Sequence, residues 1–235
     1  MSEHRSADDL FDLLERLDSV SGEVQQIEIL EQGYWYKVFD IAWKDGIHFV
    51  VHIFSAQDYK TGMYSVEKSG EQISLTYRFG KVDDNLLRRM QRVIDEIDSG
   101  KYKNKKTLSE KITSIVNQRG LVSYMNNTKW RELLSALKEE LPDIELQYKT
   151  LFEEESPDVY WELFGDEYIE VMNYAQIEWF RIKCVITEIT HIGMLVPPKV
   201  KTYDKKDEIL KILKRYSISY EYDENKGAFL VYGYK

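Results

Sequence analysis

Residues 39–54 read FDIAWKDGIHFVVHIF, with apolar runs on either side of Lys44-Asp45-Gly46. An Asp-Gly pair supplies the positive φ angles that a tight hairpin turn requires. The run after the turn, 47–54, is far shorter than a membrane helix, and its Val and Ile residues are typical of a buried strand. The stretch therefore predicts an antiparallel hairpin in a folded core.

The sequence on both sides of this hairpin extends the same arrangement. One helix is expected to start at Ser6, and a second is expected to be capped by Asp83-Asp84 and to end at Ser99-Gly100. Because the strands follow one another without intervening helices, residues 1–100 predict an α+β domain with an antiparallel sheet. Its strands are expected within 23–43 and over 47–54, 62–68 and 72–79.

A basic linker over 101–120 is expected to precede a second domain over 121–235. In that domain, Thr128 is expected to cap a helix that contains Trp130 and stops at Pro142. The fold class predicted for the whole chain is α+β, with two small domains that each have an antiparallel sheet and flanking helices. The other elements expected here are strands over 145–152, 160–164, 168–174 and 178–185, a helix over 204–216, and a hairpin of 218–222 and 228–232.

The composition excludes several classes of protein. The chain of 235 residues has 32 Lys and Arg against 41 Asp and Glu, a net charge of −9 with histidine neutral. This balance argues against nucleic-acid binding, which needs a basic surface. We expect no membrane span and no secretory signal, because the apolar runs are short and the first residues are polar. A single cysteine, Cys184, excludes an internal disulfide, and a cytoplasmic protein is expected.

The acidic residues are concentrated in one part of the chain, residues 139–178, which we call the acidic segment. It contains 13 acids and one base, Lys149, a net charge of −12. Aromatic residues lie between these acids, and Tyr and Trp are enriched at binding hot spots. We therefore predict a partner-binding surface within 153–170. Its residues are Glu153, Glu154, Glu155, Asp158, Trp161, Glu162, Asp166, Glu167, Tyr168 and Glu170.

The other reactive groups give weaker signals. His48 and His52 lie four residues apart on an expected strand, which separates them by about 13 Å, so one metal ion cannot bridge them directly. For His191 no partner serine or cysteine can be assigned, and Cys184 is expected to be buried as a small apolar residue. The chain has no glycine-rich nucleotide motif and no EF-hand spacing. No catalytic residue, cofactor or metal ligand is predicted.

One short motif carries a resemblance. Asn126-Asn127-Thr128-Lys129-Trp130 is similar to the opening of an uncharacterised bacterial domain family, and the resemblance covers about 121–235. Small α+β bacterial domains of this kind resemble the immunity proteins that accompany secreted polymorphic toxins. The resemblance implies that an acidic, aromatic-rich face blocks a basic toxin domain, often a nuclease. It implies no catalytic residues.

The expected function is therefore that of a non-enzymatic immunity or antitoxin protein that binds a basic partner. One alternative is a hydrolase that uses a divalent ion at Glu162, Asp166, Glu167 or Glu170. Another alternative is a structural module that self-associates through an exposed strand edge.

Overall fold

A computed structural model describes residues 4–26, 35–55, 58–154, 161–163, 173–190 and 197–235. The chain forms two compact units, Met1–Lys111 and Ile112–Lys235. Each unit combines helices with an antiparallel sheet, so the predicted α+β class is confirmed.

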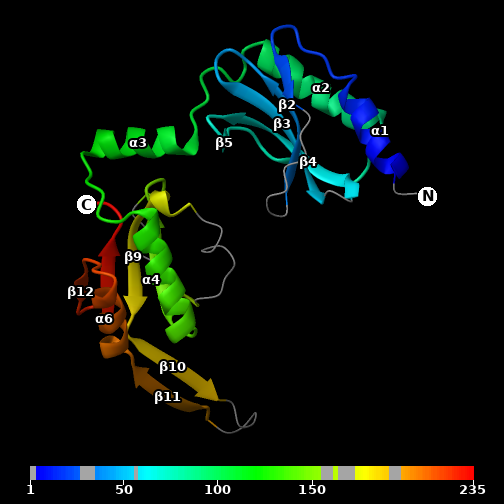
Figure 1. Ribbon diagram of the computed structural model, residues 1–235. Helices are drawn as coiled ribbons and strands as arrows, with labels where there is room; N and C mark the ends of the chain where they lie inside the picture. Colours follow the sequence, from blue (N-terminus) through cyan, green and yellow to red (C-terminus); the bar gives the residue numbers. More distant parts are fainter. Residues whose placement is uncertain (1–3, 27–34, 56–57, 155–160, 164–172, 191–196) are drawn as a thin grey trace. The chain divides into compact units, whose positions relative to one another are not determined.

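The first unit contains a curved antiparallel sheet and two helices (Figure 1). Its strands follow the order β1-β2-β3-β4-β5, and β6 pairs with β4. The predicted hairpin is confirmed, because β2 and β3 pair on either side of Gly46, which has a φ of 78°. The elements are α1 (His4–Leu14), β1 (Glu23–Gln26), β2 (Tyr36–Ala42), β3 (Ile47–Ser55), β4 (Asp58–Lys68), β5 (Glu71–Gln72), β6 (Tyr77–Phe79) and α2 (Asp84–Asp98).

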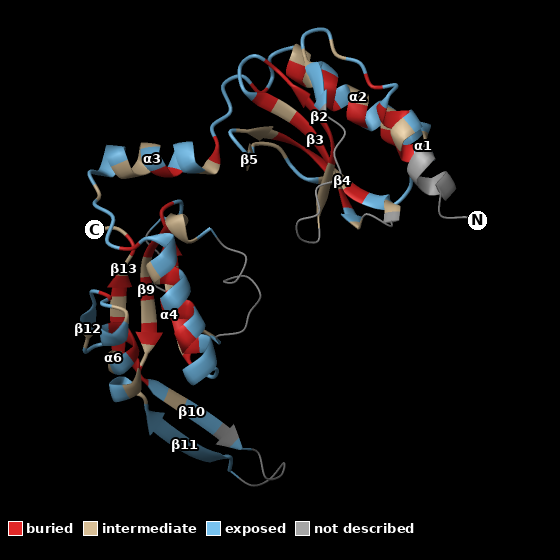
Figure 2. Cartoon of the chain, in the orientation of Figure 1, coloured by how far each residue is buried: buried red, intermediate tan, exposed pale blue. Residues whose placement is uncertain are grey.

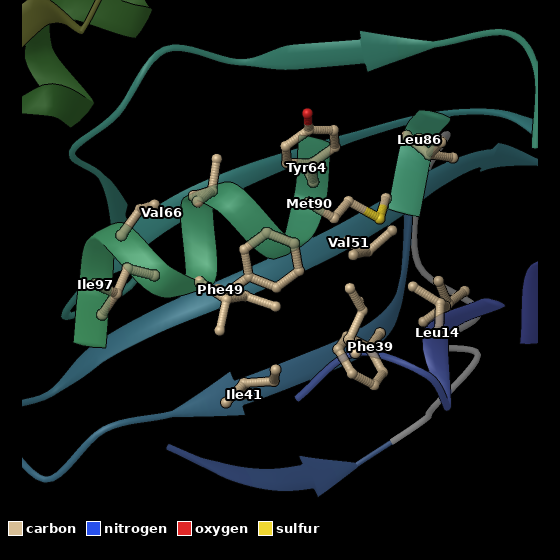
Figure 3. Close-up of a cluster of buried hydrophobic side chains, with 14 of the residues drawn as sticks. Leu14, Phe39, Ile41, Phe49, Val51, Tyr64, Val66, Leu86, Met90 and Ile97 are labelled. Carbon is tan, nitrogen blue, oxygen red and sulfur yellow. The ribbon is translucent and has the colours of Figure 1, made fainter. Parts of the chain in front are cut away.

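The core of the first unit lies between these helices and one face of the sheet (Figure 3). Asp83 begins α2 as predicted, because its side chain accepts the backbone N–H groups of Asn85 and Leu86. The apolar residues of α2 then recur every three or four positions and face the strands. The buried residues of α2 are Leu86, Met90, Val93, Ile94 and Ile97.

The segment expected as a linker is largely structured. Tyr102 is 2% exposed and belongs to the core of the first unit. Most of the segment's second half forms a helix, α3 (Leu108–Arg119), which ends before Gly120, a residue with a φ of 64°. The two units divide within α3, between Lys111 and Ile112.

The second unit contains a five-stranded antiparallel sheet in the order β12-β13-β9-β7-β8. Two helices, α4 and α6, pack on one face of it and enclose the core with Phe180, Ile182 and Phe229 (Figure 1). The elements are α4 (Asn127–Glu140), β7 (Glu145–Thr150), β8 (Glu162–Leu163), the 3-10 turn η1 (Tyr174–Gln176), β9 (Ile177–Lys183), β10 (Val185–Thr190), β11 (Lys199–Asp204), α6 (Lys206–Arg215), β12 (Glu221–Asp223) and β13 (Ala228–Tyr232).

The helix starts differ from the prediction at two places. The N-cap of α4 is Asn126, whose side chain accepts the N–H of Lys129 at 2.8 Å, and Thr128 lies inside the helix. The prediction of Thr128 as the cap was therefore wrong, because Asn126 is an equally good capping residue two positions earlier. The first helix begins at His4 and not at Ser6.

The strand expected over 178–185 is interrupted at Cys184. The backbone N–H of Cys184 donates to the carbonyl of Gly227 at 2.9 Å, and its carbonyl accepts the N–H of Lys205 at 2.7 Å. Beyond this residue, β10 leaves the five-stranded sheet and pairs with β11, forming a separate two-stranded ribbon (Figure 1).

Candidate functional site

The predicted binding surface lies between β7 and η1 in the second unit. The structure describes Glu153, Glu154, Trp161 and Glu162 of the ten predicted residues. The remaining six lie outside the described residues. They are Glu155, Asp158, Asp166, Glu167, Tyr168 and Glu170.

The start of this surface is an exposed turn after β7. The carboxylate of Glu153 accepts the backbone N–H of Thr150 at 2.7 Å, which holds the turn closed. Glu154, the next residue, is exposed. Phe152, the residue before Glu153, is 43% exposed. Two carboxylates thus lie beside an exposed aromatic ring at the end of β7.

Trp161 and Glu162 lie beside the opposite end of β7, where β8 forms one edge of the sheet. Glu162 is opposite Leu146 in the pairing of β8 with β7. The ammonium group of Lys183 lies 5.6 Å from the ring centroid of Trp161, within the range of a cation–π contact. Both Trp161 and Glu162 are half-buried, so this part of the surface is less accessible than the turn at Glu153.

Several acids of the acidic segment form ion pairs with cations that are distant in the sequence, so these acids differ from those exposed to solvent. Glu178 receives two hydrogen bonds from Arg119, at 2.8 and 2.6 Å, and one from Lys149 at 2.9 Å. The hydrogen bonds from Arg119 are the main cause of a lowered pKa of Glu178, Lys149 lowers this pKa further, and burial opposes the shift. This carboxylate is therefore ionised and bound within the protein.

Two other acids of the acidic segment have partners from later parts of the chain. Arg215 of α6 binds Glu140, and Lys183 of β9 binds Glu145. The net charge of −12 therefore overstates the negative charge available to a partner.

The aromatic residues within and just after the acidic segment divide between core and surface. Phe180 is fully buried, and Tyr148 and Tyr174 pack against the same core. Trp179 lies on the opposite face of the sheet, with the guanidinium of Arg181 4.3 Å from its ring centroid. Phe152 is the most exposed of the described aromatics in this segment.

A second polar cluster covers the face of the first sheet that is turned away from α1 and α2. His48 and His52 lie on this face of β3, because their neighbours Phe49, Val51 and Ile53 face the core. The Nδ1 atom of His48 lies 3.0 Å from Oδ1 of Asp40.

Each histidine of this face has a carboxylate partner. Asp40 is 4% exposed and also binds Lys37. A carboxylate can only accept hydrogen bonds, so Nδ1 of His48 carries the proton that is donated to Asp40. The Nε2 atom of His52 lies 3.4 Å from Glu67. The Nε2 atom of His48 then carries the lone pair of the ring and can accept a hydrogen bond.

Sequence reasoning missed both carboxylates. Asp40 has a signal in the sequence, because it is the single charge in the apolar run 39–43, and a buried charge is normally paired. Glu67 has none, because its contact with His52 joins residues that are 15 positions apart.

Cys184 is 2% exposed, as predicted. Burial raises the pKa of its thiol to about 11, so the neutral form dominates at physiological pH. His191 lies outside the described residues. Among the residues that are described, no three metal-ligating side chains converge, and no helix has the length and apolar character to cross a membrane.

Comparison with known families gives a match for the C-terminal half. The model of a family of unknown function, DUF6678, matches residues 112–235, which is more than half of the chain. The expectation that the C-terminal half is a member of an uncharacterised family is confirmed to that extent. No curated protein and no solved structure matches the chain.

Proposed function

This chain belongs to the family of unknown function DUF6678, and from that premise we propose that it is a non-enzymatic protein of the immunity or antitoxin type. In this proposal it binds and neutralises a basic toxin domain. The binding surface is the predicted one within 153–170, and the exposed acids at its start make the first contact.

The observation that supports this proposal most strongly is the position of Lys149. It is the only cation in the acidic segment, and its side chain is 6% exposed and bound to Glu178. The cation therefore does not neutralise the exposed acids of the segment. Within the described part of the chain, four exposed acids of this segment form no ion pair. They are Glu139, Asp143, Glu153 and Glu154.

Exposed carboxylates of one sign act on a basic partner over a distance. They accelerate its approach, and the effect weakens as salt screens the charges. Phe152, 43% exposed beside Glu153 and Glu154, adds an apolar group that a partner can bury. The turn after β7 thus combines charge that attracts a basic protein with a ring that can anchor it.

The first experiment identifies the partner. The full-length chain is immobilised, proteins from a lysate of the source cells are captured, and the retained proteins are eluted with increasing salt. We expect a basic protein that elutes at high salt, that stops growth when expressed alone, and that is tolerated when co-expressed with this chain. Retained proteins without toxicity would contradict the immunity function.

The second experiment maps the surface. Glu153→Gln together with Glu154→Gln removes two charges, and the side-chain amide introduced in place of the Glu153 carboxylate still offers an oxygen to the N–H of Thr150. The control, Asp12→Asn with Glu15→Gln, removes the same charge from exposed positions at the end of α1 and just after it, in the first unit. At low salt we expect the first pair to slow association several-fold and the control pair to have little effect. Equal association rates for both variants would refute the assignment to this segment.

A further inference from the structure

The β10–β11 ribbon exposes nearly all of its residues. Its strands pair at six successive positions and form a two-stranded sheet of their own. Every residue of β11 is exposed, and Figure 2 shows this along the whole strand. Val200 is 55% exposed and Val185 is 37% exposed. Two-stranded ribbons are marginally stable in water by themselves, so this one gains stability when another surface covers it.

The two faces of the ribbon differ in charge. Residues that are opposite in an antiparallel pair share a face, so the register assigns each residue to one side. One side, which we call the uncharged face, carries no charge along most of its length. Its single charged residue, Asp204, lies at the base of the ribbon, where its side chain accepts the N–H of Lys206. The other residues of this face with described side chains are Val185, Thr187, Val200 and Thr202.

The opposite side, the charged face, carries both signs of charge. Glu188 is opposite Lys201, and Lys199 is opposite Thr190. The hydroxyl of Tyr203 donates to Glu188 at 3.1 Å. The charged face also carries Ile186, opposite Tyr203, and Ile186 packs against the core of the second unit. Farther along the ribbon, one face is uncharged and β-branched and the other carries the charges, which is the pattern of a strand pair with one buried face.

We propose that the uncharged face of the ribbon binds the same face of a second copy of this chain. The face is self-complementary, as a two-fold contact requires, because it presents β-branched side chains and no charge beyond its base. The net charge of the ribbon supports a second copy of the chain as the binding partner. The chain has a net charge of −9, whereas the two strands carry two acids and two bases, a net charge of zero. Two copies therefore meet here with less repulsion than at the acidic surfaces.

The size of the face sets the strength of the contact. Six residues span about 20 Å and two strands about 10 Å, so each copy buries a few hundred Å². Stable interfaces bury about 800 Å² on each partner. The dimer is therefore weak and forms only at high protein concentration.

Sedimentation of the full chain over a concentration series tests this proposal. We expect a reversible monomer–dimer equilibrium between about 1 μM and about 1 mM. Thr187→Glu places a charge in the uncharged face and should weaken the dimer at least tenfold. Thr190→Glu is the matched control, because it makes the same change in the same strand but on the charged face, opposite Lys199. It should leave the dimer unchanged.

Circular dichroism establishes that each variant is folded before sedimentation. Val200→Thr, which keeps a β-branched residue and removes apolar surface, should weaken the dimer by a smaller factor than Thr187→Glu. A chain that remains monomeric at the highest concentration would overturn the proposal. A dimer that Thr187→Glu leaves intact, or that Thr190→Glu weakens equally, would also overturn it, because the contact would then lie elsewhere. These outcomes are independent of the acids at Glu153 and Glu154.

Discussion

Arg119, the last residue of α3, donates two hydrogen bonds to the carboxylate of Glu178 on β9, at 2.8 and 2.6 Å. The same carboxylate accepts a hydrogen bond from Lys149, which is buried. One acid thus binds two cations, and only one of these cations, Arg119, has substantial access to solvent.

Glu178→Gln should destabilise the second unit by about 2–4 kcal/mol, because it leaves the ammonium of Lys149 buried without its countercharge. Arg119→Ala should cost less, about 1 kcal/mol, since Arg119 is 39% exposed and its loss leaves Glu178 paired with Lys149. Urea denaturation of both variants measures the difference. Equal losses would contradict the role assigned to Lys149.

The same carboxylate makes stability depend on pH. The pKa of Glu178 is lowered from 4.5 in the folded chain, so its contribution is fully present above 4.5 and is lost as the pH falls through the folded pKa. The difference in unfolding free energy between the wild type and Glu178→Gln should therefore shrink as the pH is lowered below 4.5. A difference that stays constant would show that ionisation of Glu178 does not stabilise the fold.

Asp98 provides a second pH-dependent contribution, in the first unit. Burial alone would raise its pKa, but hydrogen bonds from the Trp43 indole, the N–H of Val20 and the hydroxyls of Ser21 and Ser19 lower it to about 2. The stabilisation is therefore present above 3.8 and is lost between 3.8 and about 2. Asp98→Asn should cost about 1–2 kcal/mol at neutral pH and almost nothing near pH 2. Denaturation across this pH range measures both values.

Substitutions at the start of α4 can test which residue caps the helix. Asn126→Ala should destabilise the second unit by about 1 kcal/mol, because it removes the acceptor for the N–H of Lys129. Thr128→Ala should be neutral or slightly stabilising, since Thr128 lies within the helix and alanine is the better helix former. Thermal unfolding of the two variants compares them, and a larger loss for Thr128→Ala would contradict the assignment of Asn126 as the cap.

Cys184 should react slowly with thiol reagents in the native protein. It is 2% exposed, so a reagent has little access to the sulfur. Burial also raises the pKa of the thiol to about 11, so little of the reactive thiolate form is present at neutral pH. We expect labelling at neutral pH to be at least about 100-fold slower than in the chain unfolded in urea. Fast labelling under native conditions would place Cys184 outside the core.

Local signals predicted most of the fold. The Asp45-Gly46 turn, the cap at Asp83 and the spacing of apolar residues in α2 each act within a few residues, and the structure contains all three. The start of α4 was predicted wrongly because Asn126 and Thr128 have similar capping tendencies, and local sequence does not choose between them. The ribbon was missed because Val185–Thr190 follows β9 with no turn residues between the two strands, and only contacts with Gly227 and Lys205 end β9 at Cys184.

The candidate surface was predictable only in part for the same reason. A charge count treats all 13 acids of the acidic segment alike, whereas Glu140, Glu145 and Glu178 bind cations 75, 38 and 59 positions away. Such pairs depend on the tertiary fold and leave no local pattern. Exposed acids next to an aromatic ring, as at Phe152–Glu154, are adjacent in sequence and were therefore visible from it.

The hydrogen bonds of Cys184 have a consequence for deuterium exchange along the ribbon. The amides of Cys184 and Lys205 are bonded at its base and should take up deuterium slowly. Along β10 and β11, every second amide points to the neighbouring strand, and the others point outward to solvent. Uptake should therefore alternate from residue to residue. Contact through a face of the ribbon covers side chains but leaves the outward amides free to exchange. Pairing along an edge would protect these amides. The exchange pattern therefore reports which surface of the ribbon is in contact with a partner.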